Sequence, residues 1–267
     1  IIFYSWAMYF VLAAFGYETI NFNGVVKRLL LGGITRNQDG GFVPGFMWMY
    51  LLIPAMNVYI NLATRKNLFW TLGILLSMFT ICGTFLNANV YHHVFWYVTL
   101  YLVGAMVRLS PFEWMKSNRM CIPLLCGSIL IAWASVVCFD YLAVWLGRPS
   151  WTPHSFVADS HKLLAFTTAL SAFLVFKNLH IPQSRFINSL ASTTFGVLLI
   201  HAATDGMRKW LWQDFVNVPS AYSMPLSELI AYSAVVMLGV FAVCSAIDYL
   251  RIRFVERPMF RRIFPYA

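Results

Sequence analysis

Charged residues are scarce in this sequence. Asp, Glu, Lys and Arg make up 11% of its 267 residues, whereas hydrophobic residues make up 60%. Soluble globular chains carry about 25% charged residues, so this composition excludes an ordinary soluble domain. The mean hydropathy of +0.68 points the same way. The composition therefore predicts a polytopic membrane protein.

Motifs for several common chemistries are missing as well. The sequence has no Gly-rich phosphate loop, no nucleophile elbow and no zinc motif. No two cysteines have the CxxC spacing of a metal or redox site, and all five lie within apolar runs. We therefore predict no metal site, and we interpret the cysteines as packing residues.

Long apolar runs occupy most of the chain. Because one helical crossing needs about 20 apolar residues, we predict an all-α transmembrane bundle of about eight membrane helices. We expect residues 1–267 to form a single domain. The predicted segments are Ile1–Gly16, Gly45–Leu62, Leu68–Leu86, Val94–Leu109, Cys121–Leu146, Lys162–Leu179, Leu190–Trp212 and Leu226–Leu250.

Basic residues stand at the ends of these apolar segments. The net charge is +9, but its distribution indicates membrane lipid as the partner and no nucleic acid. More of the cations fall on the side of the N-terminus and the C-terminal tail. The positive-inside rule therefore predicts a multi-pass cell-membrane protein with both ends of this chain in the cytoplasm. The tail contributes Arg251, Arg253, Arg257, Arg261 and Arg262.

One apolar stretch, residues 189–212, carries polar side chains at helical spacing. Thr194, His201, Asp205 and Arg208 follow one another at intervals of 7, 4 and 3. On a helix that turns about 100° per residue, they fall within a sector of roughly 60°. A charged side chain at mid-membrane costs about 3 kcal/mol or more, so such groups usually face a protein interior or a wet cavity. The polar stripe is therefore a candidate site.

The stripe allows two interpretations. Asp205 lies four residues after His201, so its carboxylate would orient the imidazole as a general base for a hydroxyl nucleophile. Alternatively, Arg208 pairs with Asp205, and His201 is a neutral histidine that hydrogen-bonds within the bundle. Spacing alone leaves both open. His201 and Asp205 are the candidate catalytic residues.

Arg108 ends an apolar segment on the predicted cytoplasmic side. An arginine at such a position can bind a phosphate or pyrophosphate group bidentately, as coenzyme A would require. The simpler interpretation is that Arg108 marks the inner boundary of a helix. Both remain open.

Several stretches resemble a known family. STTFGVLLIH (Ser192 to His201) resembles the TFG-Tyr-LIH signature of acyltransferase family 3, the bacterial integral-membrane O-acetyltransferases of surface polysaccharides, although Leu198 replaces the usual tyrosine. Three further stretches are similar to other family segments and occur in the expected order: GFMWMYLLIPAMNVYIN (Gly45 to Asn61), FWYVTLYLVGAMVRL (Phe95 to Leu109) and IDYLRIRFVERPMF (Ile247 to Phe260).

This resemblance implies transfer of an acetyl group from acetyl-CoA, on the cytoplasmic side, to a sugar hydroxyl of a surface or lipid-linked glycan. Arg108 then becomes a cofactor-binding candidate. Trp48 and Tyr50 become candidates for stacking on a sugar ring. His201 becomes a supporting residue on the acceptor side.

The resemblance also implies that the chain lacks the first two of ten core helices. The family's first helix carries the histidine regarded as catalytic, and no position here matches it. We therefore expect an N-terminally truncated domain with no transferase activity on its own. The alternative function is a membrane transporter or a glycan-translocating protein, because a polar stripe in a helical bundle also describes a transport pathway.

Overall fold

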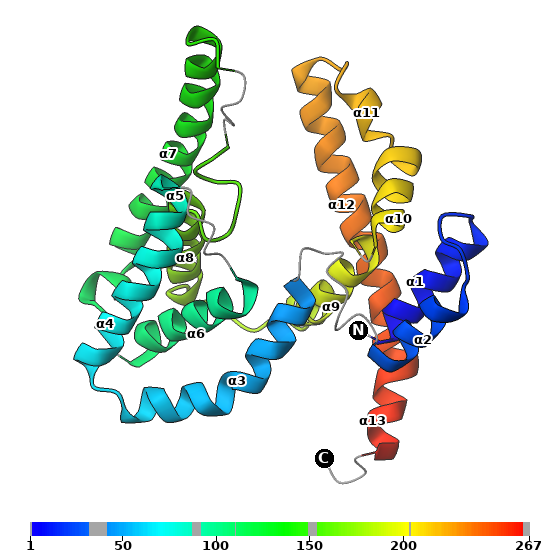
Figure 1. The fold of residues 1–267 in the computed structure, drawn as a ribbon, viewed down its shortest axis with the longest axis horizontal. Coiled ribbons are helices and arrows are strands. Elements are labelled where there is room, and N and C mark those ends of the chain that lie inside the picture. The colour runs from blue at the N-terminus through cyan, green and yellow to red at the C-terminus, as the bar shows by residue number, and fades with distance from the viewer. Residues whose placement is uncertain are drawn as a thin grey trace. The chain divides into compact units, whose positions relative to one another are not determined.

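The computed structural model describes residues 2–31, 42–86, 92–109, 111–148, 154–202 and 204–263, with the side chains of 2 and 27–31 outside this description. All regular structure in these ranges is helical (Figure 1), which confirms the all-α prediction. Helices pair every interior backbone N–H and C=O internally, as hydrocarbon requires. The chain divides into a central unit, residues 45–181, and a terminal unit, residues 1–44 and 182–267.

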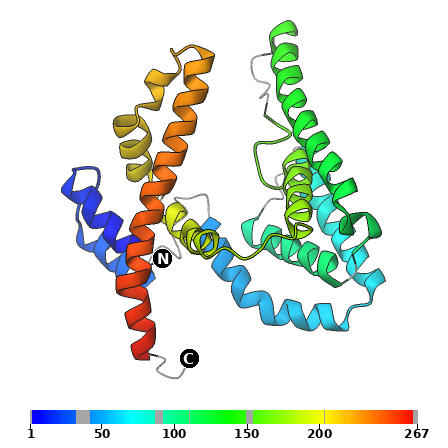
Figure 2. The same cartoon turned by 180° about the vertical axis from the view of Figure 1, so that it is seen from behind.

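The central unit is held together by apolar helix faces. Helices α7 and α8 lie side by side (Figures 1 and 2), and the hydroxyls of Ser128 and Ser171 lie 3.4 Å apart between them. Phe79, Trp96 and Phe166 form a buried aromatic cluster. The elements are α3 (Phe42–Leu62), α4 (Arg65–Leu76), the π-helical η2 (Ser77–Cys82), α5 (Gly83–Phe85), α6 (His93–Leu109), η3 (Glu113–Lys116), α7 (Asn118–Trp145) and α8 (Leu163–Lys177).

The terminal unit is organised around its longest helix, α12. Helices α10 and α11 lie along the first half of α12, and α1 and α9 lie along its second half (Figures 1 and 2). A buried apolar cluster that includes Leu12, Ile200 and Cys244 joins them. The elements are α1 (Ile2–Ala14), α2 (Phe22–Leu31), α9 (Arg185–His201), α10 (Asp205–Arg208), the π-helical η4 (Lys209–Phe215), α11 (Val218–Ala221), α12 (Leu226–Arg251), the π-helical η5 (Ile252–Glu256) and α13 (Arg257–Ile263).

Helix lengths limit the number of membrane crossings. Each predicted apolar segment contains helix, but only four helical runs in the described residues are long and apolar enough to cross: Phe42–Leu62, Arg65–Phe85, Asn118–Trp145 and Leu226–Ile263. A bent pair of helices would make a fifth. Three apolar helices are shorter, Phe3–Ala14, His93–Leu109 and Leu163–Lys177. The prediction of eight crossings is therefore not confirmed.

The basic tail continues the last membrane helix. The run Leu226–Ile263 has 38 residues, which at 1.5 Å per residue makes it about 57 Å long. A hydrocarbon core is about 30 Å thick, so one end of this run extends beyond it. Arg257, Arg261 and Arg262 lie exposed at that end, where they can contact lipid headgroups.

A buried carboxylate connects three helices of the terminal unit. Asp248 on α12 is 0% exposed, and its Oδ1 accepts hydrogen bonds from the Tyr4 hydroxyl of α1 at 2.6 Å and from Arg251 Nε at 2.7 Å. On α9, a Cβ added to Gly196 would lie 2.0 Å from Asp248 Cγ. Because Gly196, the glycine of the TFG stretch, has no side chain, the Asp248 carboxylate can occupy the space beside it.

Gly196→Ala is expected to lower the free energy of unfolding by about 1–3 kcal/mol or more, because the methyl group forces Asp248 away from its partners. Thermal unfolding in detergent measures the effect. Gly239→Ala is the matched control on α12, since an added Cβ there meets no atom within 4 Å. Equal melting temperatures for the two variants would contradict this packing.

A buried lysine joins α5 to α8 in the central unit. Lys162 is 8% exposed, and its Nζ donates a hydrogen bond to the Gly83 carbonyl at 2.6 Å. The neighbouring His161 lies against Gly83, where an added Cβ would come within 2.9 Å of the imidazole. Burial lowers the pKa of His161, the Asp159 carboxylate opposes this shift, and the Lys162 charge adds to it. His161 is therefore a neutral group at pH 7.

Candidate functional site

The predicted polar stripe is interrupted. Helix α9 ends at His201, α10 begins at Asp205, and the two directions differ by 94°. The Thr204 side chain accepts the backbone N–H of Met207 at 3.1 Å and so caps the new helix. The prediction of one continuous helix over residues 190–212 was wrong, because this cap starts a second helix. Thr194, His201, Asp205 and Arg208 therefore do not share one helix face.

His201 and Asp205 have separate partners. Asp205 Oδ1 pairs with Arg208 Nη1 at 3.2 Å, whereas His201 Nδ1 lies 2.7 Å from the Val197 carbonyl oxygen. A carbonyl accepts only from a protonated Nδ1, so in a neutral His201 this contact leaves Nε2 as the acceptor nitrogen. The contact with the backbone thus orients the His201 ring. The predicted His–Asp pair is not formed.

His201 also contacts an aromatic ring beyond the break. Its imidazole lies edge-on to the indole of Trp212, with ring centroids 6.2 Å apart. The ring is half-buried at the end of α9. Interrupted helices at membrane depth occur where the backbone lines a cavity or is buried in protein. The break at His201 is therefore a plausible location for chemistry.

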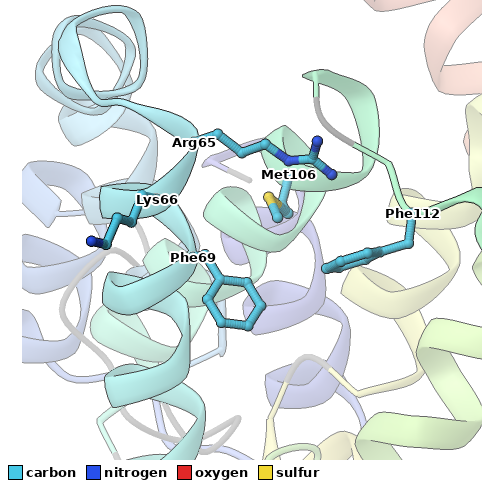
Figure 3. A pocket seen from close by; sticks show the side chains of 5 residues that line it. All are labelled: Arg65, Lys66, Phe69, Met106 and Phe112. Atoms are coloured by element: carbon cyan, nitrogen blue, oxygen red, sulfur yellow. The ribbon is translucent and has the colours of Figure 1, made fainter.

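A basic cavity of about 410 Å³ lies in the central unit. Its lining residues are Arg65, Lys66 and Phe69 at the start of α4, Met106 on α6, and Phe112 just after α6. Figure 3 shows Arg65 reaching across the cavity toward Phe112, whereas the ammonium group of Lys66 points away from that ring. The Arg65 guanidinium carbon lies 5.8 Å from the centre of the Phe112 ring. The cavity therefore combines one cation that reaches across it, Arg65, with the rings of Phe69 and Phe112.

Arg108 lies on the same end of α6 as this cavity. It follows the lining residue Met106 by two positions and is exposed. Among the residues that the structure describes, it makes no hydrogen bond or ion pair, whereas nearby Lys116 pairs with Glu113 at 2.7 Å. This leaves the Arg108 guanidinium available to an anion.

Trp48 and Tyr50 lie on α3, where they are 56% and 63% exposed. Positions two apart on a helix point about 200° from each other, so the two rings do not form one platform. Tyr50 packs instead near Phe46, with ring centroids 5.9 Å apart. Their assignment to sugar binding stays a prediction.

The polar network around Asp248 has no counterpart in the sequence predictions. Arg251 bridges Asp248 to Glu256, and its guanidinium lies 5.5 Å from the Tyr4 ring. Two carboxylates thus surround one cation, which disfavours an anionic ligand. The three-residue spacing of Asp248 and Arg251 signals the ion pair, but nothing local signals Tyr4, 244 residues away.

The side chains of the described residues do not indicate a metal site. In the described ranges, no group of three or more His, Cys, Asp and Glu side chains is placed to hold a metal ion. The cysteines of these ranges are free thiols, and Cys121 and Cys244 are buried among apolar side chains.

Membrane-length apolar helices and an interrupted span indicate a polytopic membrane protein. A family model described as an acyltransferase domain matches residues 1–247. The chain belongs to acyltransferase family 3, a family of membrane acyltransferases, and the resemblance of its motifs is confirmed. No curated protein and no solved structure matches the chain significantly.

Proposed function

We propose that the protein transfers an acetyl group from acetyl-CoA to a sugar hydroxyl of a surface or lipid-linked polysaccharide. The observation that carries this proposal is the basic cavity, because a thioester donor with several phosphates needs fixed cations beside an apolar wall. Family membership supplies the reaction class. If both ends of the chain are cytoplasmic, as the distribution of basic residues predicts, Arg65, Lys66 and Arg108 lie on the side where acyl-CoA occurs.

Donor binding is assigned to Arg65, whose guanidinium reaches across the cavity, with Lys66 and Arg108 as further cations near it. Arg65 and Arg108 offer bidentate hydrogen bonds to phosphate oxygens, and Lys66 adds a point charge. Phe112 already carries the Arg65 guanidinium on its face, and this stack orients the cation for a ligand. The adjoining Phe69 ring offers an apolar surface to the rest of the donor.

In the terminal unit, His201 is the candidate residue for the step at the acceptor. Its Nε2 accepts a hydrogen bond from the sugar hydroxyl and so supports removal of the proton. The hydroxyl oxygen bonds to the thioester carbonyl carbon, the C–S bond breaks, and the proton ends on the coenzyme A thiolate. Asp205 has no part in this step while it is paired with Arg208.

Glycan translocation is the second candidate function. The interrupted span at His201 favours it, because transporters bind substrates at discontinuous helices. The two functions differ in the product. A transferase yields an acetylated glycan and free coenzyme A, whereas a translocator delivers the glycan unmodified.

Removing both cavity cations tests the donor site. Arg65→Ala combined with Lys66→Ala is expected to weaken coenzyme A binding at least about tenfold, because charge-assisted hydrogen bonds contribute about 1.5–3 kcal/mol each. Titration calorimetry on protein in nanodiscs measures the dissociation constant. Lys209→Ala is the control, since Lys209 is exposed and lies in the other unit. An unchanged dissociation constant in the double variant would refute the site.

Replacing His201 tests its role in the step at the acceptor. In membranes of cells that express the natural gene, His201→Ala should lower incorporation of labelled acetyl into glycan at least about tenfold, because a positioned proton acceptor contributes roughly 10²–10⁴-fold. Turnover in Lys209→Ala should match the wild type. Full turnover in His201→Ala would return this residue to a packing role. A comparable loss in Asp205→Asn would revive the predicted His–Asp pair.

A further inference from the structure

A second cavity, of about 330 Å³, lies in the terminal unit where η4, α11 and α12 meet. Its polar and aromatic lining consists of Trp212, Tyr222, Tyr232 and Ser233. The Tyr232 hydroxyl donates a hydrogen bond to the Val216 carbonyl, which fixes that ring in the wall. Tyr222 is 81% exposed and stands at the opening.

This lining differs from that of the other cavity in the same unit. That cavity, of about 580 Å³, lies between α1 and the second half of α12 and is lined by side chains such as Leu12, Phe15 and Val240. Such a surface suits an alkyl chain. The cavity at Trp212 instead adds the hydroxyl groups of its tyrosines and Ser233 to a wall that also contains aliphatic side chains such as Val218 and Leu229. Rings that carry a polar tip pack against surfaces that are partly apolar and partly wet.

The cavity lies next to His201, the residue proposed to act on the acceptor hydroxyl. Trp212, in its wall, is the ring that contacts His201 edge-on. The cavity also lies beside the start of α12, because Leu229 lines it. Leu229 and Arg251 are 22 residues apart on that helix, a rise of about 33 Å. This separation is close to the hydrocarbon thickness, so the Leu229 end of the cavity lies toward the membrane face opposite the basic tail, whereas Met237, which also lines it, lies nearer to mid-membrane.

We propose that this cavity binds the sugar ring of the acceptor, with Trp212, Tyr222 and Tyr232 packed on its C–H faces and Ser233 hydrogen-bonded to a hydroxyl. This inference rests on the proposed function and names the residues of its acceptor site. It assigns sugar stacking to these three rings instead of Trp48 and Tyr50, whose side chains point in different directions on α3. Surface glycans occur on the face toward which the Leu229 end of the cavity lies if the tail is cytoplasmic.

Saturation-transfer NMR tests direct binding. The protein is placed in phosphatidylcholine nanodiscs, and the probes are the methyl glycosides of glucose, N-acetylglucosamine and galacturonic acid. Tyr222→Ala should lower the saturation of the bound sugar about fivefold, since one lost ring contact removes about that much affinity. Tyr141→Ala, at a 74% exposed tyrosine of α7, should leave the saturation unchanged.

Three outcomes would overturn the inference. The first is no saturation of any of the three sugars, and the second is equal signals in the Tyr222→Ala and Tyr141→Ala variants. The third is that Tyr222→Ala leaves the sugar signals unchanged and lowers only the saturation transfer to the phosphatidylcholine chains. That result would show that the cavity binds lipid. Both substituted tyrosines are mostly exposed, so both variants are expected to fold, and melting temperatures verify this.

An acetyl-transfer assay distinguishes failure of the sugar site from failure of the proposed function. In membranes from cells that express the natural gene, Tyr222→Ala should raise the KM for the acceptor glycan about fivefold and leave the KM for acetyl-CoA unchanged. Normal transfer with an unchanged acceptor KM would overturn the sugar site and leave the proposed function intact. No transfer by the wild type would instead refute the proposed function, and the NMR result would still decide whether the cavity binds sugar.

Discussion

The Asp248 carboxylate is the contact on which the terminal unit depends. It accepts hydrogen bonds from Tyr4 of α1 and Arg251 of α12, and it lies directly against Gly196 of α9. An isolated charge buried in a low-dielectric interior costs several kcal/mol, which good geometry and added hydrogen bonds offset. Three helices must therefore keep their relative positions for Oδ1 of the carboxylate to keep its two hydrogen bonds. This contact also anchors α9, whose last residue is His201.

The cost of burying an unpaired charge also limits where polar side chains lie in each unit. Among the residues that the structure describes, Arg108 at the end of α6 and Arg257, Arg261 and Arg262 in α13 are exposed charges near helix ends. The buried polar side chains described in the terminal unit are Thr193, Thr204, Ser245 and Asp248. A basic donor cavity and an aromatic acceptor cavity can therefore form without leaving a bare charge in hydrocarbon.

Much of this fold could be predicted from apolar runs, since each predicted segment contains helix. The break after His201 was missed because apolar spacing continues across it, although Thr204 followed by Asp205 is an ordinary helix start. The predicted number of crossings is not confirmed, because α1, α6 and α8 are shorter than the other apolar helices. The contact of Tyr4 with Asp248 and the ring cluster at Trp212 depend on packing between helices, which local spacing does not encode.

The most direct measurement of the central claim uses sealed membrane vesicles of known orientation that contain the protein expressed from its natural gene. Labelled acetyl-CoA is supplied on one side only, and the label in the glycan is counted. The account predicts labelled glycan when acetyl-CoA is on the side of the basic tail and none when it is on the other side. Labelling only from the opposite side, or unmodified glycan crossing the membrane, would contradict it.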